Sequence, residues 1–128
     1  MKLDTQKPGL CALFLPYKAA MLKHLYEVTK TDSLAGKGSG YLWKWLQKNA
    51  KRLGVTTMSR ASVVNALNDL VDEGLLKFKE VTGKGGIRRL YSVAMTPREF
   101  EDHFLNEFIA TLHTIFQGDW WKLEAEGL

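Results

Sequence analysis

The chain has 128 residues, of which 45% are hydrophobic and 25% are charged. This is the balance of an ordinary globular protein that is long enough to bury one core. No apolar run approaches the ~20 residues that cross a bilayer, so we expect no membrane span. Cys11 is the one cysteine, which excludes an internal disulfide and a cysteine-based zinc site. We therefore expect a cytoplasmic protein with no metal and no cofactor.

Positive charge is concentrated in the first three quarters of the chain. Residues 1–95 hold 16 Lys and Arg against 7 Asp and Glu, a formal charge of +9, whereas residues 96–128 hold 2 against 7, a charge of −5. No acidic residue lies between Asp32 and Asp69. Such a stretch suits a nucleic-acid backbone, because each neutralised phosphate releases a condensed counterion. A solvated basic surface is the alternative, and charge alone does not separate the two.

The first part of the chain predicts two helices separated by a loop. Pro16 suits the first position of a helix, which apolar residues at helical spacing extend to about residue 30. Residues 31–40 are polar and glycine-rich, which predicts a loop, and a second helix is expected over 41–51. Residues 1–15 fit either an arm or a short strand. The positions expected to face the core are Leu15, Ala19, Leu22, Leu25, Tyr26, Leu42, Leu46, Ala50 and Leu53.

A third helix and a β-hairpin are expected next. Ser59 is a favourable N-cap, and Gly74 ends the helix in the manner of a glycine just beyond its last turn. Residues 75–81 and 87–93 then have the composition of strands, joined by a glycine-rich turn over 82–86. The buried face of the third helix is expected to hold Val63, Leu67, Leu70 and Val71, with Val64 at its edge.

The segment that begins at Thr96 predicts a separate C-terminal helix. Thr96 can cap it, Pro97 fits its first position, and Glu99 can close a capping box. We expect this helix to run to about residue 116 within a C-terminal part, 96–128, that follows a first domain over 1–95. Its apolar stripe is broad enough for a homodimer interface, although folding back on its own domain is the alternative. The predicted interface residues are Phe100, Phe104, Phe108, Leu112 and Phe116.

Helix, turn, helix and hairpin in this order are typical of a winged helix-turn-helix, a mainly α fold with a small β-hairpin (α+β). In this arrangement the third helix presents its first residues to the major groove, where Arg reads guanine and Asn reads adenine. The hairpin cations suit the minor groove or its phosphates, and a plain surface hairpin is the alternative. The candidate DNA-binding residues are Lys44, Lys48, Ser59, Arg60, Ser62, Asn65, Lys84, Arg88 and Arg89.

The run SRASVVNALNDLVDEGLLKFKEVTGKGGIRRLYSV, residues 59–93, resembles winged-helix regulators of the multiple-antibiotic-resistance regulator (MarR) superfamily. It is also similar to their relatives in the penicillinase-repressor, glycine-betaine-regulator and PadR groups. SRASV resembles the start of their recognition helix, LNDLVDEGLL its end, and GGIRRLYSV the returning wing strand. The resemblance implies a dimeric repressor whose recognition helix holds Ser59, Arg60, Ser62 and Asn65, and whose wing holds Lys84, Arg88 and Arg89.

We therefore expect a sequence-specific regulator of transcription, a homodimeric repressor on double-stranded DNA, and not an enzyme. The string GKGS at residues 36–39 fails as a P-loop, because Ser or Thr must directly follow the lysine. The three histidines do not share the spacing of a helical zinc site. A plasmid or phage replication or maintenance protein, and a winged helix that binds protein, are the alternatives. The four tryptophans fit either core anchors or the lining of a pocket for a small effector, namely Trp43, Trp45, Trp120 and Trp121.

Overall fold

The computed structural model describes residues 3, 6, 10, 13–30, 32–119 and 121. These fall into two compact units, Met1–Thr96 and Pro97–Leu128. Cys11, Trp120, and most of residues 1–15 and 118–128 lie outside the described residues. The expected arm or short strand at the N-terminus therefore stays a prediction.

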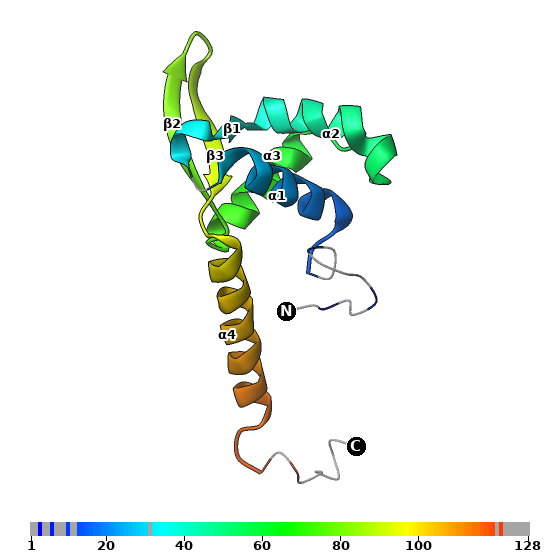
Figure 1. Ribbon diagram of the computed structural model, residues 1–128, viewed down its shortest axis with the longest axis vertical. Helices are drawn as coiled ribbons and strands as arrows, with labels where there is room; N and C mark the ends of the chain where they lie inside the picture. Colours follow the sequence, from blue (N-terminus) through cyan, green and yellow to red (C-terminus); the bar gives the residue numbers. More distant parts are fainter. Residues whose placement is uncertain are drawn as a thin grey trace. The chain divides into compact units, whose positions relative to one another are not determined.

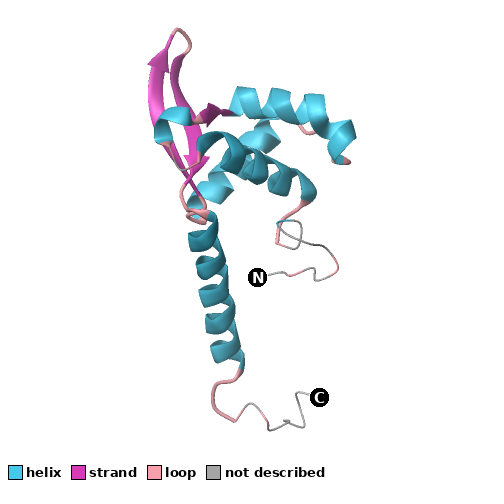
Figure 2. Ribbon diagram, viewed as in Figure 1, coloured by secondary structure: helices cyan, strands magenta, loops and turns pink. Residues whose placement is uncertain are grey.

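The first unit contains, among its described residues, three α-helices, a short 3-10 helix and three strands (Figures 1 and 2). In chain order they are α1 (Pro16–Thr29), the 3-10 helix η2 (Ser33–Ala35), β1 (Lys37–Gly38), α2 (Ser39–Leu53), α3 (Arg60–Asp72), β2 (Leu76–Gly83) and β3 (Gly86–Val93). This order is that of a winged helix-turn-helix, so the predicted α+β class is confirmed at that level.

The sheet contains a strand that the sequence analysis missed. β1 pairs with β3 through Lys37↔Tyr91 and Gly38↔Leu90, and the strand order is β1-β3-β2 with antiparallel neighbours. The expectation of a loop over 31–40 and of a hairpin alone is therefore wrong. A two-residue strand shows no alternation, so the polar, glycine-rich composition hid it. As a result α2 begins at Ser39, directly after the strand, and not at residue 41.

The hairpin is longer and tighter than expected. β2 and β3 pair from Leu76↔Val93 to Gly83↔Gly86, which leaves only Lys84 and Gly85 in the turn. Gly86 has a φ of 99°, a conformation that glycine adopts without a steric penalty. Figure 1 shows the tip of this hairpin extending away from the helices of the first unit.

The core of the first unit lies where the three α-helices meet the base of the sheet. The apolar pattern predicted its main contributors, but Leu15 is 62% exposed because it precedes the first turn of α1. Val71 is half-buried, whereas Met21 and Ala66 are buried without having been predicted. The buried apolar residues of this unit are Ala19, Met21, Leu22, Leu25, Leu42, Leu46, Ala50, Val63, Ala66, Leu67, Leu70, Leu75, Leu76, Tyr91 and Val93.

The second unit consists, in its described part, of α4 (Pro97–Ile115) and the residues that follow it. The helix begins at the predicted proline and ends one residue before the expected position. Phe100 packs against Phe104 with 4.7 Å between ring centres, and it is buried within the single chain. None of the described helices combines the length and the apolar character of a membrane span.

Thr29 links α1 to the sheet through one buried hydroxyl. Its Oγ1 donates to the carbonyl oxygen of Leu25 at 2.7 Å and accepts from the backbone N–H of Val93 at 3.2 Å. Thr29 is 1% exposed, so water cannot replace either bond. The hydroxyl thereby satisfies a backbone donor at the end of β3 that would otherwise be buried without a partner.

We predict that Thr29→Val lowers the free energy of unfolding by about 1–3 kcal/mol, the usual cost of leaving a buried donor unsatisfied. Thr29→Ser keeps the hydroxyl and serves as the control, with a smaller loss. Urea denaturation followed by circular dichroism measures both. Equal stability of the valine variant and the wild type would show that this hydroxyl does not hold the sheet to α1.

Candidate nucleic-acid interface

The backbone just before α3 is held by hydrogen bonds from α2. The carbonyl oxygen of Met58 accepts from Trp43 Nε1 at 2.9 Å and from Gln47 Nε2 at 3.2 Å. These bonds fix the residue that immediately precedes the cap of α3. The Ser59 hydroxyl accepts from the backbone N–H of Ser62 at 3.1 Å and donates to the Ser62 hydroxyl at 2.9 Å, so the predicted N-cap is confirmed.

α3 presents two rows of partly accessible side chains. Residues four apart lie on the same face of a helix, and this spacing produces both rows. One row lines a pocket beside β3, and the other is exposed along the outside of the helix. The pocket row is Arg60, Val64 and Asn68, and the outer row is Ala61, Asn65 and Asp69.

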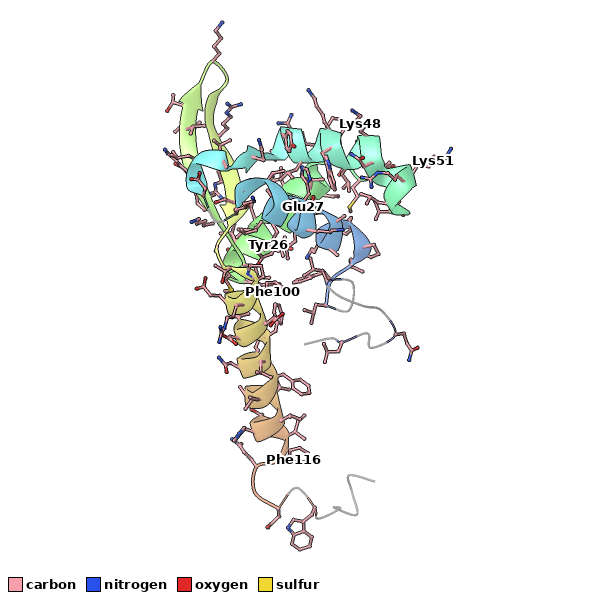
Figure 3. The ribbon with its side chains drawn as sticks, viewed as in Figure 1. Tyr26, Glu27, Lys48, Lys51, Phe100 and Phe116 are labelled. Atoms are coloured by element: carbon pink, nitrogen blue, oxygen red, sulfur yellow. The ribbon has the colours of Figure 1, made fainter. Side chains whose placement is uncertain are left out.

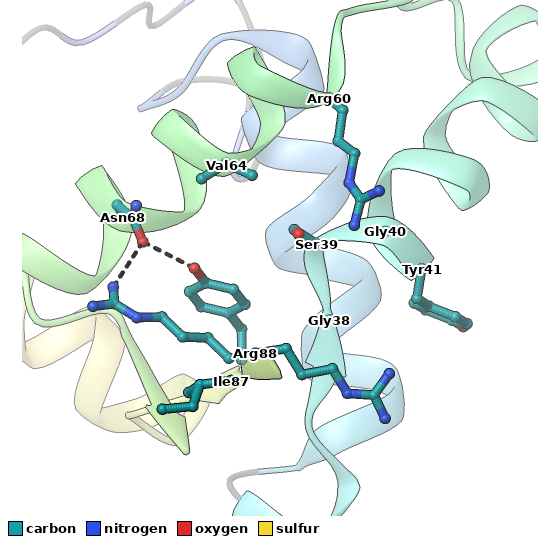
Figure 4. Close-up of a pocket in the computed structure, with 11 residues that line it drawn as sticks. Gly38, Ser39, Gly40, Tyr41, Arg60, Val64, Asn68, Ile87 and Arg88 are labelled. Atoms are coloured by element: carbon teal, nitrogen blue, oxygen red, sulfur yellow. Dashed lines mark hydrogen bonds between the residues drawn. The ribbon is translucent and has the colours of Figure 1, made fainter. Parts of the chain in front are cut away.

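The pocket lies between α3, β3 and the start of α2, and its volume is about 530 Å³ (Figure 4). Tyr91 is buried at its base, whereas Ile87 is 71% exposed. On the side of α2 it is lined by residues 38–41, two of which are glycines. The lining residues are Gly38, Ser39, Gly40, Tyr41, Arg60, Val64, Asn68, Ile87, Arg88, Arg89 and Tyr91.

The lining is rich in hydrogen-bond donors and contains no acidic side chain. Among the described residues, Arg60 and Arg88 make no ion pair or side-chain hydrogen bond. α2 begins with Gly38 as its N-cap, which offers no capping side chain, and its first turn contains no acidic residue. The first N–H groups of a helix have no partner within it and carry partial positive charge. The pocket therefore favours an anionic group with several acceptor oxygens.

The guanidinium of Arg60 lies beside Gly40 at the start of α2. A Cβ at position 40 would lie 3.0 Å from Nη2 of Arg60 and 3.4 Å from its Cζ. Figure 4 shows the guanidinium of Arg60 directed at Gly40. The glycine thus leaves room for the cation beside the first turn of α2.

Arg88 and Arg89 are neighbours in sequence but differ in their surroundings. Arg89 Nη1 donates to the side-chain oxygen of Asn68 at 3.2 Å, and its guanidinium lies 4.0 Å from the centre of the Phe78 ring. Its Nε is 3.9 Å from a carboxylate oxygen of Glu80. Arg89 is therefore held by groups of the protein, whereas Arg88 extends past Gly38 without such partners among the described residues (Figure 4).

The other predicted DNA-binding residues do not line this pocket. Lys44 and Lys48 are exposed on α2. Figure 3 shows Lys48 near the top of the view, where the tip of the hairpin also lies. Lys84 is exposed in the hairpin turn, and Asn65 belongs to the outer row of α3. Ser59 and Ser62 are engaged with each other in the cap. Their contacts with DNA stay predictions.

The segment 38–41, Asn68 and Tyr91 belong to the site but were not predicted from the sequence. The spacing of Asn68 from Arg60 and Val64 was a usable signal, since these three share one helix face. The segment 38–41 gave no such signal, because its place beside β3 follows from the pairing of β1.

An aromatic stack borders the pocket at Tyr41. The ring of His24 stacks on Trp45, with 4.1 Å between centres, and its Nε2 is 3.0 Å from the Tyr41 hydroxyl. Burial lowers the pKa of His24 below its ordinary value, Glu27 opposes this shift, and Lys37 adds to it. Within the described ranges, no group of three or more His, Cys, Asp or Glu side chains could hold a metal ion.

Comparison with known proteins supports the winged-helix fold but does not assign the chain to a family. No family model matches the sequence, and no curated protein matches it either. Among solved structures, the chain is similar to that of the Aeropyrum pernix ORC1 protein in complex with DNA, with a TM-score of 0.55 and 19% sequence identity. The similarity covers 78% of this chain but only 26% of the ORC1 chain, so the chain corresponds to about a quarter of that protein.

Proposed function

We propose that this chain binds duplex DNA with α3, the pocket beside it and the β2–β3 hairpin. The observation that carries the proposal is the pocket itself, which is lined by three arginines and placed between α3 and the hairpin. The similarity to the ORC1 protein, which was solved in complex with DNA, supports the same ligand.

The arrangement matches the surface of a DNA duplex. An α-helix fits the major groove, and a phosphate backbone separates that groove from the adjacent minor groove. With α3 in the major groove and the hairpin over the minor groove, the backbone between them runs along the pocket. Arg60 and Arg88 then neutralise phosphates, since they have no acidic partner among the described residues.

Base reading belongs to the outer row of α3 in this proposal. Asn65 is exposed and can form a bidentate contact with adenine, which is worth about 1–3 kcal/mol of discrimination. Asp69 lies one turn further along, 3.8 Å from Lys18, and repels phosphate. Contact is therefore confined to the first turns of α3. We further propose, as the sequence resemblance implies, a sequence-specific, cytoplasmic repressor of transcription of the MarR type, without enzymatic activity.

The salt dependence of binding tests this proposal. We predict that binding to a fluorescein-labelled random duplex weakens steeply with salt, with about 0.9 units of log–log slope for each phosphate contact. Arg60→Met and Arg88→Met should each reduce the slope by roughly one contact. Fluorescence anisotropy across a potassium chloride series measures these slopes.

Lys51→Met is the matched control, because it removes one exposed cation that lies ten residues, or about 15 Å, along α2 from Tyr41 at the pocket. It should leave the slope unchanged. Wild-type protein that shows no salt-dependent binding would contradict the proposed function and favour a winged helix that binds protein. An equal reduction of the salt slope in all three variants would indicate that DNA is bound by the overall positive charge of the surface and not by the pocket.

We also propose that α4 joins two copies of the chain. Several large apolar side chains of this helix and its end are exposed, although Phe100 is already buried in the single chain and Phe104 and Leu112 are half-buried. The C-terminal part carries a net charge of −5, which opposes contact with DNA, and we propose that a second copy covers the exposed apolar side chains. The exposed residues are Leu105, Phe108, Ile109, Ile115 and Phe116.

Sedimentation-velocity centrifugation tests the dimer. We predict a mass of twice 14.5 kDa for the wild type at micromolar concentration, and a monomer for Phe108→Asp, because the charge would be buried in the interface. Glu101→Gln changes an exposed residue of the same helix and should remain dimeric. A monomeric wild type would rule out this role for α4.

A further inference from the structure

We propose that Arg89 is a positioning residue that fixes the hairpin against α3, and that it does not itself neutralise a DNA phosphate. The inference rests on the proposed function, which it deepens. Sequence patterns treat Arg88 and Arg89 alike, since both are cations on the returning strand. Their surroundings in the structure separate them.

The guanidinium of Arg89 is occupied on two sides. Toward β2, it lies 4.0 Å from the centre of the Phe78 ring and 3.9 Å from Glu80, its cross-strand partner. Toward α3, its Nη1 donates to Asn68 at 3.2 Å. A guanidinium that stacks on a ring and forms a charge-assisted hydrogen bond is fixed in orientation, and its charge is partly compensated by the carboxylate.

Asn68 is the point at which the hairpin meets α3. Its side-chain oxygen accepts from Arg89 and also from the Tyr91 hydroxyl at 2.9 Å, as the dashed lines in Figure 4 mark. Both donors come from β3, and the acceptor lies on the pocket row of α3. These bonds set the separation between helix and hairpin, and therefore the width available to a phosphate backbone between them.

Two variants isolate this role. Asn68→Ala removes the acceptor without changing any charge, and Arg89→Met removes the donor and the charge. Each should weaken binding to the random duplex by about tenfold, a size typical of coupled contacts, while the salt slope stays at the wild-type value. The double variant should weaken binding by less than the product of the two single effects, because the hydrogen bond between Asn68 and Arg89 is lost in both single variants.

Arg88→Met is the matched control, since it removes the neighbouring charge and should reduce the salt slope by about one contact. A slope for Arg89→Met that falls in the same way, together with an Asn68→Ala variant that binds normally, would overturn the inference. Circular dichroism melting of every variant verifies that the full-length protein is folded in the binding assay.

Amide hydrogen exchange in the absence of DNA tests the link independently. Exchange in the hairpin, residues 79–90, should become faster in Asn68→Ala and Arg89→Met but not in Arg88→Met. Unchanged exchange in the first two variants would contradict the link. If exchange rises but the wild type shows no salt-dependent DNA binding, the proposed function fails, and with it the role of the link in binding DNA.

Discussion

The side-chain oxygen of Asn68 accepts two hydrogen bonds from β3, and this contact links the pocket row of α3 to the returning strand of the hairpin. A helix alone offers one row of side chains to a groove, and a two-stranded hairpin alone is marginally stable in water. Held together, they enclose a pocket whose walls come from three elements. The width of the pocket thus depends on the separation of α3 and β3 at this contact.

The third wall of the pocket depends on a strand of two residues. Because Lys37 and Gly38 pair with β3, the first turn of α2 is brought beside Arg88 and faces α3. Glycine at position 40 then admits the guanidinium of Arg60. The pairing of β1 with β3 and the lack of a side chain at Gly40 therefore bring hydrogen-bond donors together in the pocket. Such a group of donors favours the binding of an anion.

Local signals in the sequence predicted most of the helices and the hairpin. Ser59, Pro16 and Pro97 mark helix starts because capping and proline geometry act within one turn, and Gly74 has the left-handed φ of 79° that its position requires. The short strand β1 and the full length of the hairpin were not predicted. Both depend on pairing between strands, and a segment of two or three residues is too short to show an alternating apolar pattern. Turn composition gave the place of the hairpin but not its register.

The candidate site was predictable in its residue types and not in its arrangement. Arg60, Arg88 and Arg89 were identified from charge and element order, and the structure places all three around one pocket. Their different surroundings were beyond a sequence pattern, because Phe78, Glu80 and Asn68 surround Arg89 only once strand register and helix packing are set.

The central claim is that a DNA backbone lies in the pocket between α3 and β3. A two-dimensional heteronuclear NMR titration of the full chain with a random duplex tests it most directly, because each backbone amide reports on its own surroundings. We predict the largest shifts at Ser39, Gly40, Arg60 and Arg88, with little change at Glu27 on α1. Shifts confined to α4, or to the Lys44 and Lys48 side of α2, would contradict it.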